Sequence, residues 1–339
     1  MTTSRRDFLG AMLCASGALA TGCRKAEPSS KPPTKTSAPL ITNYNDSGLP
    51  RLTEGKTLLI SLISSSAMPD LEGSLPVQIE PESFGGQQLN EPQPLSFYPD
   101  NNDRRVIRTI LSAPLDVVAG TQPLSFSTRE RAGNEPPWDF PYLIERGIYR
   151  EASLTLDKDF SSPTEDIINR QRQDFAEMVE ILKLRTPRSW SRPFAMPVDR
   201  GDNDNFGVRR TVNGTKRYRH RGLDLHAPLK TPVHAVNDGT VVLSTDQWTA
   251  GKTICIDHGG GLFSKYAHLY SSDVNKGDEV KRNQVIALSG NSGGQKAPPH
   301  LHLDIIINGT HVDPKNFMLT TAVQLLAAEG KGRGPAQSG

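Results

Sequence analysis

Cysteine is scarce in this chain, and neither sign of charge is in excess. The 339 residues include three cysteines, and 39 lysines and arginines stand against 37 aspartates and glutamates. The balanced charge gives no reason to expect nucleic acid as a partner. Because Cys14 and Cys23 lie close to the N-terminus, only Cys255 remains for the folded part, which excludes a disulfide framework. Residues 253–258 and 262–269, divided by the glycines at 259–261, are predicted to form a hairpin. Within residues 253–256, Cys255 is expected to be a small buried strand residue.

The N-terminal apolar run, residues 8–20, is too short to cross a bilayer comfortably and is built like a signal-peptide core. Arg5 and Arg6 directly before it resemble a twin-arginine export signal. Residues 19–23 resemble the lipobox of bacterial lipoproteins, in which the cysteine, here Cys23, is acylated; residues 18–20 as an ordinary cleavage site are the alternative. We therefore predict a signal peptide over residues 1–23 and export to the periplasmic face. The protein is expected to be lipid-anchored to the outer membrane, or soluble in the periplasm if the lipobox is not used.

The next two segments differ in composition. Residues 24–50 are rich in proline, serine, threonine and lysine, which predicts a disordered tether. Residues 51–160 contain short apolar segments divided by turn residues, a pattern typical of a β-sandwich. A packing or spacer domain is favoured over a carbohydrate-binding module, for which an aromatic patch of Trp138, Phe140 and Tyr142 would be the basis. The predicted strands are residues 57–64, 74–79, 94–98, 106–111, 122–127 and 147–156.

A linker helix is predicted over residues 161–187, ending at about Arg185 because Pro187 stops it. Ser162 is expected to be its N-cap, Pro163 its first residue and Glu165 the closing member of a capping box. We interpret the helix as a strut between two domains, and the alternative is a removable plug over the functional site.

Two histidine-containing segments carry the strongest functional signal. If residues 218–225 form a strand, His220 and Asp224 share one face, and His300, His302 and Asp304 likewise share a face of a second strand. Two imidazoles and a carboxylate are ligands that Zn²⁺ accepts, and three protein ligands leave a fourth position for water. A single histidine is more often structural, but all eight histidines of the chain lie between residues 220 and 311.

At these positions the sequence resembles the lysostaphin-type (LytM-type) zinc endopeptidases, which cut the peptide cross-links of peptidoglycan. The resemblance covers about residues 190–318. Besides the two histidine motifs it includes, in the family's order, residues 206–210, 231–239, 256–259, 266–269 and 312–314. It departs from the family at residues 296–299 (Lys-Ala-Pro-Pro), which stand where the family usually has a small Thr-Gly-Pro turn, and at Asn283, which replaces a glycine that the family often has.

The resemblance implies roles for particular residues. One Zn²⁺ ion would be bound by His220, Asp224 and His302, and His268 and His300 would be the catalytic histidines. Asp304 lies on the ligand face and is expected to orient an imidazole from the second shell. The remaining histidines match no functional position of the family and are interpreted as structural: His226, His234, His258 and His311.

The resemblance also implies the fold and the function. We expect a mainly β protein: an N-terminal Ig-like β-sandwich at 51–160, the linker helix, and a β-rich peptidase domain at 188–319 with half-barrel-like antiparallel sheets. The C-terminal segment, residues 320–339, is expected to contain a short helix, at about residues 319–329, and a disordered tail. The implied activity is hydrolysis of the cross-link between D-Ala and diaminopimelate in cell-wall remodelling. The alternatives are a non-catalytic activator of cell-wall amidases and a zinc peptidase acting on proteins.

The expected partners are the peptide stems of peptidoglycan, a membrane through the lipid anchor, and a cell-wall amidase; nucleic acid is not expected. A basic cluster around the first histidine motif raises the hypothesis that some of its members attract stem carboxylates, although a merely solvated loop is favoured. The cluster consists of Arg209, Arg210, Lys216, Arg217, Arg219 and Arg221.

Overall fold

The computed structural model describes residues 40–41, 50–63, 71–75, 93–94, 97–99, 106–128, 138–156, 162–199, 201–214, 216–294 and 297–330. The predicted signal peptide with Cys23, most of the predicted tether and the tail from residue 331 lie outside these ranges. Residues Ala38–Gly339 form one compact unit. Among the described residues, no helix has both the length and the apolar character needed to cross a membrane.

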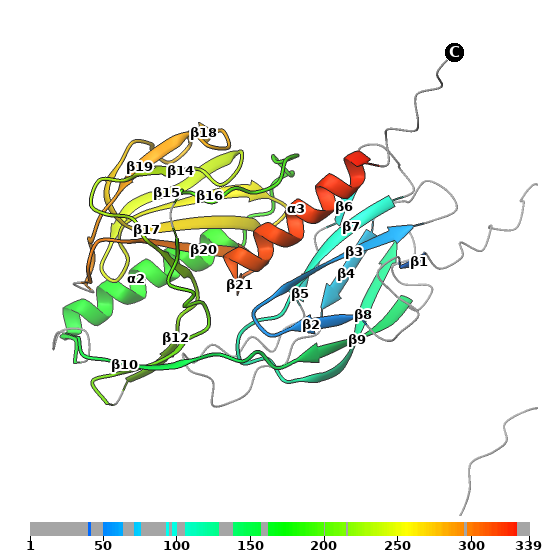
Figure 1. Ribbon diagram of the computed structural model, residues 1–339, viewed down its shortest axis with the longest axis horizontal. Coiled ribbons are helices and arrows are strands. Elements are labelled where there is room, and N and C mark those ends of the chain that lie inside the picture. The colour runs from blue at the N-terminus through cyan, green and yellow to red at the C-terminus, as the bar shows by residue number, and fades with distance from the viewer. Residues whose placement is uncertain are drawn as a thin grey trace, which may run out of the picture. The chain divides into compact units, whose positions relative to one another are not determined.

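The N-terminal part is built from two β-sheets, drawn in colours from blue to green in Figure 1. Among the described residues their strand orders are β1-β3-β7-β6 and β2-β9-β8-β4-β5. The bounds are β1 Leu40–Ile41, β2 Arg51–Thr53, β3 Thr57–Ile63, β4 Leu71–Leu75, β5 Gln93–Pro94, β6 Phe97–Pro99, β7 Val106–Ser112, β8 Gly120–Thr128 and β9 Trp138–Glu145. The mainly β character is as expected, and the Ig-like assignment stays a prediction.

Several local expectations for this part need correction. Within the predicted tether, the apolar pair Leu40–Ile41 forms β1 and pairs antiparallel with β3. The segment expected as an aromatic patch is strand β9, which pairs with β8 and, in parallel, with β2. Tyr142 on β9 is buried (1% exposed), so it is unavailable for an exposed binding patch. The last predicted strand is shorter, Glu151–Leu154 (β10), and pairs with a strand of the C-terminal part.

The helix between the two parts, α2, spans Glu165–Leu182, within the predicted range. Its N-cap is Thr164, whose side chain accepts a hydrogen bond from the Ile167 backbone nitrogen, so the predicted cap at Ser162 was wrong by two residues. Ile181 packs into a buried cluster with Leu243 and Phe263. The helix therefore buries its apolar face against the C-terminal sheet.

The C-terminal part contains a large antiparallel sheet with the path β13-β20-β17-β16-β15-β18 among the described strands, and a smaller sheet, β10-β11-β12 (Figure 1). The predicted hairpin of residues 253–269 is confirmed as β16 and β17, joined at glycines with positive φ. The bounds are β11 Arg209–Val212, β12 Lys216–Arg219, β13 Leu223–Leu225, β14 Pro232–His234, β15 Gly239–Gln247, β16 Gly251–Gly259, β17 Leu262–Ser272, β18 Glu279–Val280, β19 Val285–Ser289, β20 Leu301–Ile307 and β21 Thr310–Val312.

The strand predicted over residues 218–225 is interrupted. β12 ends at Arg219 and pairs with β11, whereas β13 begins at Leu223 and pairs with β20. Gly222 lies in the interruption, and only glycine fits there because a Cβ would come within 2.4 Å of His302 Nε2. His220 therefore lies where the chain passes from the small sheet to the large one.

The C-terminal helix, α3, spans Pro314–Gly330 and starts five residues before the predicted helix. Asp313 accepts hydrogen bonds from the backbone nitrogens of Lys315 and Asn316, and Pro314 is the first helical residue, which together form a common helix start. Phe317 and Met318 belong to a buried cluster that also contains Leu59 and Ile110 from the N-terminal strands. Residues from both parts thus share one hydrophobic core.

Candidate metal centre

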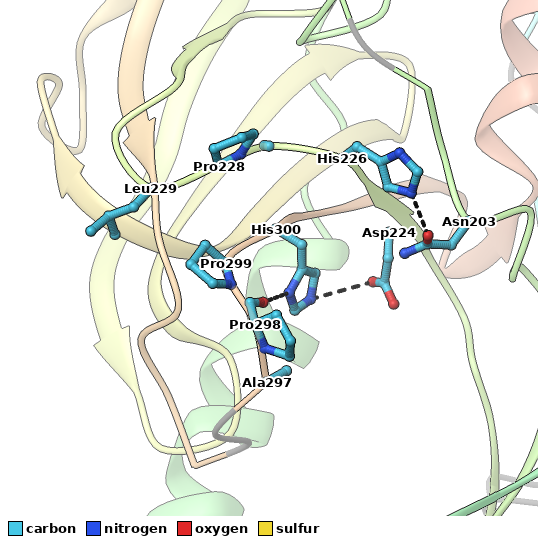
Figure 2. A pocket seen from close by; sticks show the side chains of 10 residues that line it. Asn203, Asp224, His226, Pro228, Leu229, Ala297, Pro298, Pro299 and His300 are labelled. Atoms are coloured by element: carbon cyan, nitrogen blue, oxygen red, sulfur yellow. Dashed lines mark hydrogen bonds and ion pairs between the residues drawn. The ribbon is translucent and has the colours of Figure 1, made fainter.

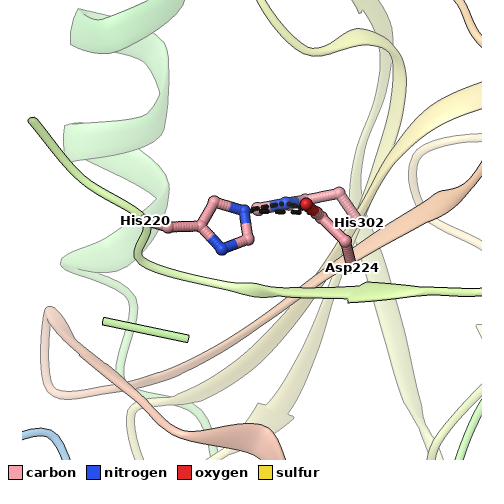
Figure 3. A group of neighbouring side chains, drawn as sticks. All are labelled: His220, Asp224 and His302. Atoms are coloured by element: carbon pink, nitrogen blue, oxygen red, sulfur yellow. Dashed lines mark hydrogen bonds and ion pairs between the residues drawn. The ribbon is translucent and has the colours of Figure 1, made fainter. Parts of the chain in front are cut away.

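Three side chains converge at the junction of β13 and β20 (Figure 3). His220 Nε2 lies 3.2 Å from Asp224 Oδ1 and 3.2 Å from His302 Nδ1, and His302 Nδ1 lies 2.9 Å from Asp224 Oδ1. In a tetrahedral zinc site with bonds of about 2.0 to 2.1 Å, neighbouring ligand atoms lie about 3.3 Å apart. The three atoms are therefore already close to the spacing that a zinc ion requires, and the donor set suits it.

The strand register explains two of these positions. Asp224 on β13 is directly opposite His302 on β20 in an antiparallel pair, and opposed residues bring their side chains together on one face. His220 reaches the same place from the connection before β13. Its main chain is fixed by hydrogen bonds between His220 N and Val208 O (2.9 Å) and between Gly207 N and His220 O (2.7 Å).

Each imidazole is oriented by a second group. His220 Nδ1 lies 2.9 Å from the Asn205 carbonyl oxygen, which can only accept, so Nδ1 carries the proton and Nε2 is free to bind a metal. His302 Nε2 lies 3.1 Å from Asp304 Oδ1, which leaves Nδ1 as the ligand atom. Asp304 is thus placed where an orienting residue was expected, and His311 Nδ1 lies 3.3 Å from the same carboxylate oxygen.

The second oxygen of Asp224 is also held. Asn205 Nδ2 donates to Asp224 Oδ2 at 2.7 Å, and Arg210 Nη2 lies 3.1 Å from the same atom. These contacts leave Oδ1 turned toward the two imidazoles. Neither contact was predicted from the sequence, although Arg210 stands in one of the motifs that carry the family resemblance.

The buried site shifts several pKa values. Burial would raise the pKa of Asp224, but the close contacts of its carboxylate with His220 and His302 outweigh this effect and hold the pKa below its usual range. Burial lowers the pKa of His220. Burial also acts to lower the pKa of His302, but the charge of Asp304 and the hydrogen bonds that the imidazole donates to both aspartates raise it to about 9. Because a ligating imidazole must be neutral, metal binding has to displace this proton.

The two predicted catalytic histidines lie beside the three candidate ligands. His268 on β17 donates through Nδ1 to the Ser292 carbonyl oxygen at 2.9 Å, and His300 donates through Nδ1 to the Pro298 carbonyl oxygen at 2.8 Å. The centres of the His268 and His300 rings are 4.8 Å apart. His300 Nε2 lies 3.7 Å from Asp224 Oδ1. Burial, followed by the nearby His302 and His300, lowers the pKa of His268 to about 3, so this imidazole is neutral at neutral pH.

A pocket of about 580 Å³ opens next to Asp224 and His300 (Figure 2). Its walls are mainly apolar, and a hydrogen bond of 2.6 Å between His226 and Asn203 forms its polar side. His226, interpreted from the sequence as structural, therefore lines this pocket. The lining residues are Asn203, Asp224, His226, Ala227, Pro228, Leu229, Ala297, Pro298, Pro299 and His300.

The other histidines interpreted as structural lie in different surroundings. His234 Nδ1 bonds the Pro197 carbonyl oxygen. His258 is fully buried and bonds the Asp238 carbonyl oxygen and Ser264 Oγ. Cys255 is buried as expected, and burial raises the pKa of its thiol to about 12.

Two members of the basic cluster are not available to attract the carboxylates of peptide stems. Arg219 is 3% exposed and forms ion pairs with Glu54 and Asp116. Arg210 is turned toward Asp224. For these two residues the hypothesis is wrong, because their charges are already compensated inside the protein.

Comparison with known proteins adds independent findings. Residues 218–314 match Peptidase family M23. The chain is 40% identical over 112 residues to the peptidoglycan DD-endopeptidase ShyA of Vibrio cholerae, a match that covers 33% of this chain and 26% of ShyA. It is 36% identical over 131 residues to ShyC of the same organism, covering 38% and 30% of the two chains. The matched segments span less than a third of these relatives.

A solved structure resembles more of the chain. A crystal structure described as an M23 peptidase candidate from Pseudomonas aeruginosa matches with a TM-score of 0.58 over 80% of this chain and 95% of its own, at 21% sequence identity. At this identity the likeness concerns the fold alone.

Proposed function

We propose that this protein is a zinc-dependent endopeptidase that hydrolyses peptide cross-links of bacterial peptidoglycan. The observation that carries the proposal is the convergence of His220 Nε2, Asp224 Oδ1 and His302 Nδ1 within 3.2 Å of one another. The match of residues 218–314 to Peptidase family M23 supports the same activity.

In the proposed mechanism, His220, Asp224 and His302 hold the ion. A bound Zn²⁺ would activate a water molecule and polarise the scissile carbonyl group. Because the Nδ1 protons of His268 and His300 are held by carbonyl oxygens, the Nε2 atom of each is available as an acceptor. One of these imidazoles takes the proton of the attacking water and can then deliver it to the leaving amine. The pocket beside His300 would receive the peptide next to the scissile bond.

The proposed substrate bond is the D-Ala to diaminopimelate cross-link, in agreement with the DD-endopeptidase names of the relatives. We further propose export through the twin-arginine signal and a lipid anchor at Cys23. These features bring the enzyme to the cell wall. Peptide stems are then its substrate, and the partnership with a cell-wall amidase remains a secondary proposal.

Digestion of purified cross-linked peptidoglycan tests the proposal. The zinc-loaded protein is expected to remove cross-linked muropeptide dimers, and a chelator or the substitution His220→Ala is expected to abolish this activity. His234→Gln is the matched control, because His234 bonds the Pro197 carbonyl oxygen outside the ligand set. Mass spectrometry of the released peptides identifies the bond.

Intact dimers after incubation with folded, zinc-loaded protein would contradict the proposal. If the protein then increased the activity of a cell-wall amidase that was added to the same assay, the result would support the non-catalytic activator instead. Cleavage that is equal in the wild type and in His220→Ala would exclude this metal centre as the source of activity.

A further inference from the structure

Glu54 lies in the turn between β2 and β3 and is fully buried. Its carboxylate accepts hydrogen bonds from the backbone nitrogens of Asp116 (2.7 Å) and Gly147 (3.0 Å). It also accepts a hydrogen bond from Arg219 Nη2 at 2.6 Å. The two backbone donors belong to the N-terminal part and fix the direction of the carboxylate. Glu54 therefore presents a fixed negative charge to an arginine of the C-terminal part.

Arg219, the last residue of β12, is enclosed on several sides. Its side chain is 1% exposed, and Nη1 lies 3.4 Å from Asp116 Oδ1. The guanidinium carbon lies 4.8 Å from the centre of the Tyr149 ring. A buried guanidinium requires such compensation, and removal of one partner leaves an unpaired charge inside the protein. The place of Arg219 consequently depends on the N-terminal part.

The next residue in the chain is the candidate ligand His220. The main chain of His220 is bonded to that of Gly207 and Val208. A Cβ on Gly207 would come within 2.3 Å of the Tyr149 ring, so this ring lies directly against Gly207. The hydroxyl of Tyr149 donates to the Glu54 carbonyl oxygen. Glu54 is thus connected to the segment around His220 by two sets of contacts, one through Arg219 and one through Tyr149.

A metal site tolerates little displacement of its ligands, because productive geometry must be held within about 0.5 Å. We propose that Glu54 and Arg219 form a positioning pair through which the N-terminal part holds His220 in the metal-binding geometry. The inference rests on the metal centre of the proposed function. It gives the N-terminal part a task beyond that of a spacer.

A second ion pair between the same two parts provides a matched control. Lys56 Nζ pairs with Asp313 Oδ2, one residue before α3 begins. Lys56→Gln removes this pair and leaves the contacts of Arg219 in place. Glu54→Gln keeps the size of the side chain but removes the negative charge that faces Arg219. Arg219→Lys keeps the positive charge but loses the planar guanidinium group with its fixed N–H donors.

The experiment measures, for the full chain and each variant, the zinc dissociation constant by competition with a chromogenic chelator. It also records the visible spectrum with Co²⁺ and the thermal unfolding of the metal-free protein. Glu54→Gln is expected to weaken zinc binding about tenfold or more and to change the Co²⁺ spectrum. Arg219→Lys is expected to have a smaller effect of the same kind. Lys56→Gln is expected to lower Tm while zinc affinity stays within about twofold of the wild type.

A folded Glu54→Gln variant with the zinc affinity and Co²⁺ spectrum of the wild type would overturn the inference and leave the proposed function intact. If Glu54→Gln does not fold, Arg219→Lys decides by the same two readouts. Equal losses of zinc affinity in Glu54→Gln and Lys56→Gln would also overturn the inference. The loss would then follow from weakening any ion pair between the N-terminal and C-terminal parts, and not from the Glu54–Arg219 pair in particular. A wild-type protein that binds no zinc would overturn the inference and the proposed function together.

Discussion

At the scale of single residues, the candidate centre depends on side chains that fix the direction of the ligand atoms. Asn205 contacts both His220 and Asp224: its carbonyl oxygen holds the imidazole and its side-chain amide holds the carboxylate. Sequence patterns identified the three candidate ligands and Asp304, but not Asn205. An asparagine in a loop has no pattern that distinguishes it, and its role arises only when the chain folds back on residues 220–224.

Gly222 allows His302 and Asp304 to pack closely against the main chain. A Cβ at this position would lie 2.4 Å from His302 Nε2 and 2.7 Å from Asp304 Oδ1. Gly222→Ala is therefore expected to push His302 away from Asp304 and to reduce zinc affinity at least tenfold. A chelator competition titration measures this. In the control, Gly201→Ala, the nearest atom is His226 Nδ1 at an ordinary 3.7 Å, and no comparable loss is expected. Unchanged zinc binding by Gly222→Ala would contradict this account.

At the scale of elements, strands β16 and β17 carry a buried histidine that affects stability. His258 on β16 bonds the Asp238 carbonyl oxygen and Ser264 Oγ on β17. Burial lowers its pKa to about 4 in the folded protein, against an unfolded value near 6.5. Between these two pH values the unfolded chain binds a proton that the folded chain does not. The free energy of unfolding therefore falls as the pH drops from about 6.5 to about 4, by about 3 kcal/mol from this group.

This prediction is checked by urea unfolding at several pH values in the presence of chelator. His258→Asn, which can still donate to the Asp238 carbonyl oxygen, is expected to lose stability at neutral pH but to depend less on pH below 6.5. His268, whose pKa is lowered to about 3, adds a similar dependence in both proteins and does not affect the comparison. Equal pH slopes for the wild type and the variant would refute the assignment to His258.

The elements themselves were predicted unevenly. The β16–β17 hairpin follows from its glycine turn between apolar strands, and α2 follows from its apolar spacing and Pro187. The interruption between β12 and β13 was missed, because the alternation of His220, Gly222 and Asp224 fits an unbroken strand equally well. The break becomes visible only in the strand pairing, in which β12 joins β11 and β13 joins β20.

At the scale of the whole molecule, metal binding is expected to stabilise the folded chain, since the three ligand atoms meet only when β13 and β20 are paired. Free zinc at 100 times its dissociation constant should add about 2.7 kcal/mol to the free energy of unfolding. Thermal unfolding with zinc and with chelator measures the shift, which should disappear in His220→Ala and persist in His234→Gln. A Tm that is independent of zinc in the wild type would argue against a preformed centre.

The sequence by itself determined the chemistry of this protein: the ligand types, their order along the chain, the histidine-rich segment and the export signal that is predicted at the N-terminus. These are local patterns, readable because each motif carries its own residue types and spacing. The tertiary structure alone decided what surrounds them. The ligands approach because β13 pairs with β20, and Arg219 is buried because Glu54, 165 positions away, supplies the opposite charge. Such contacts depend on long-range packing, which no local pattern encodes.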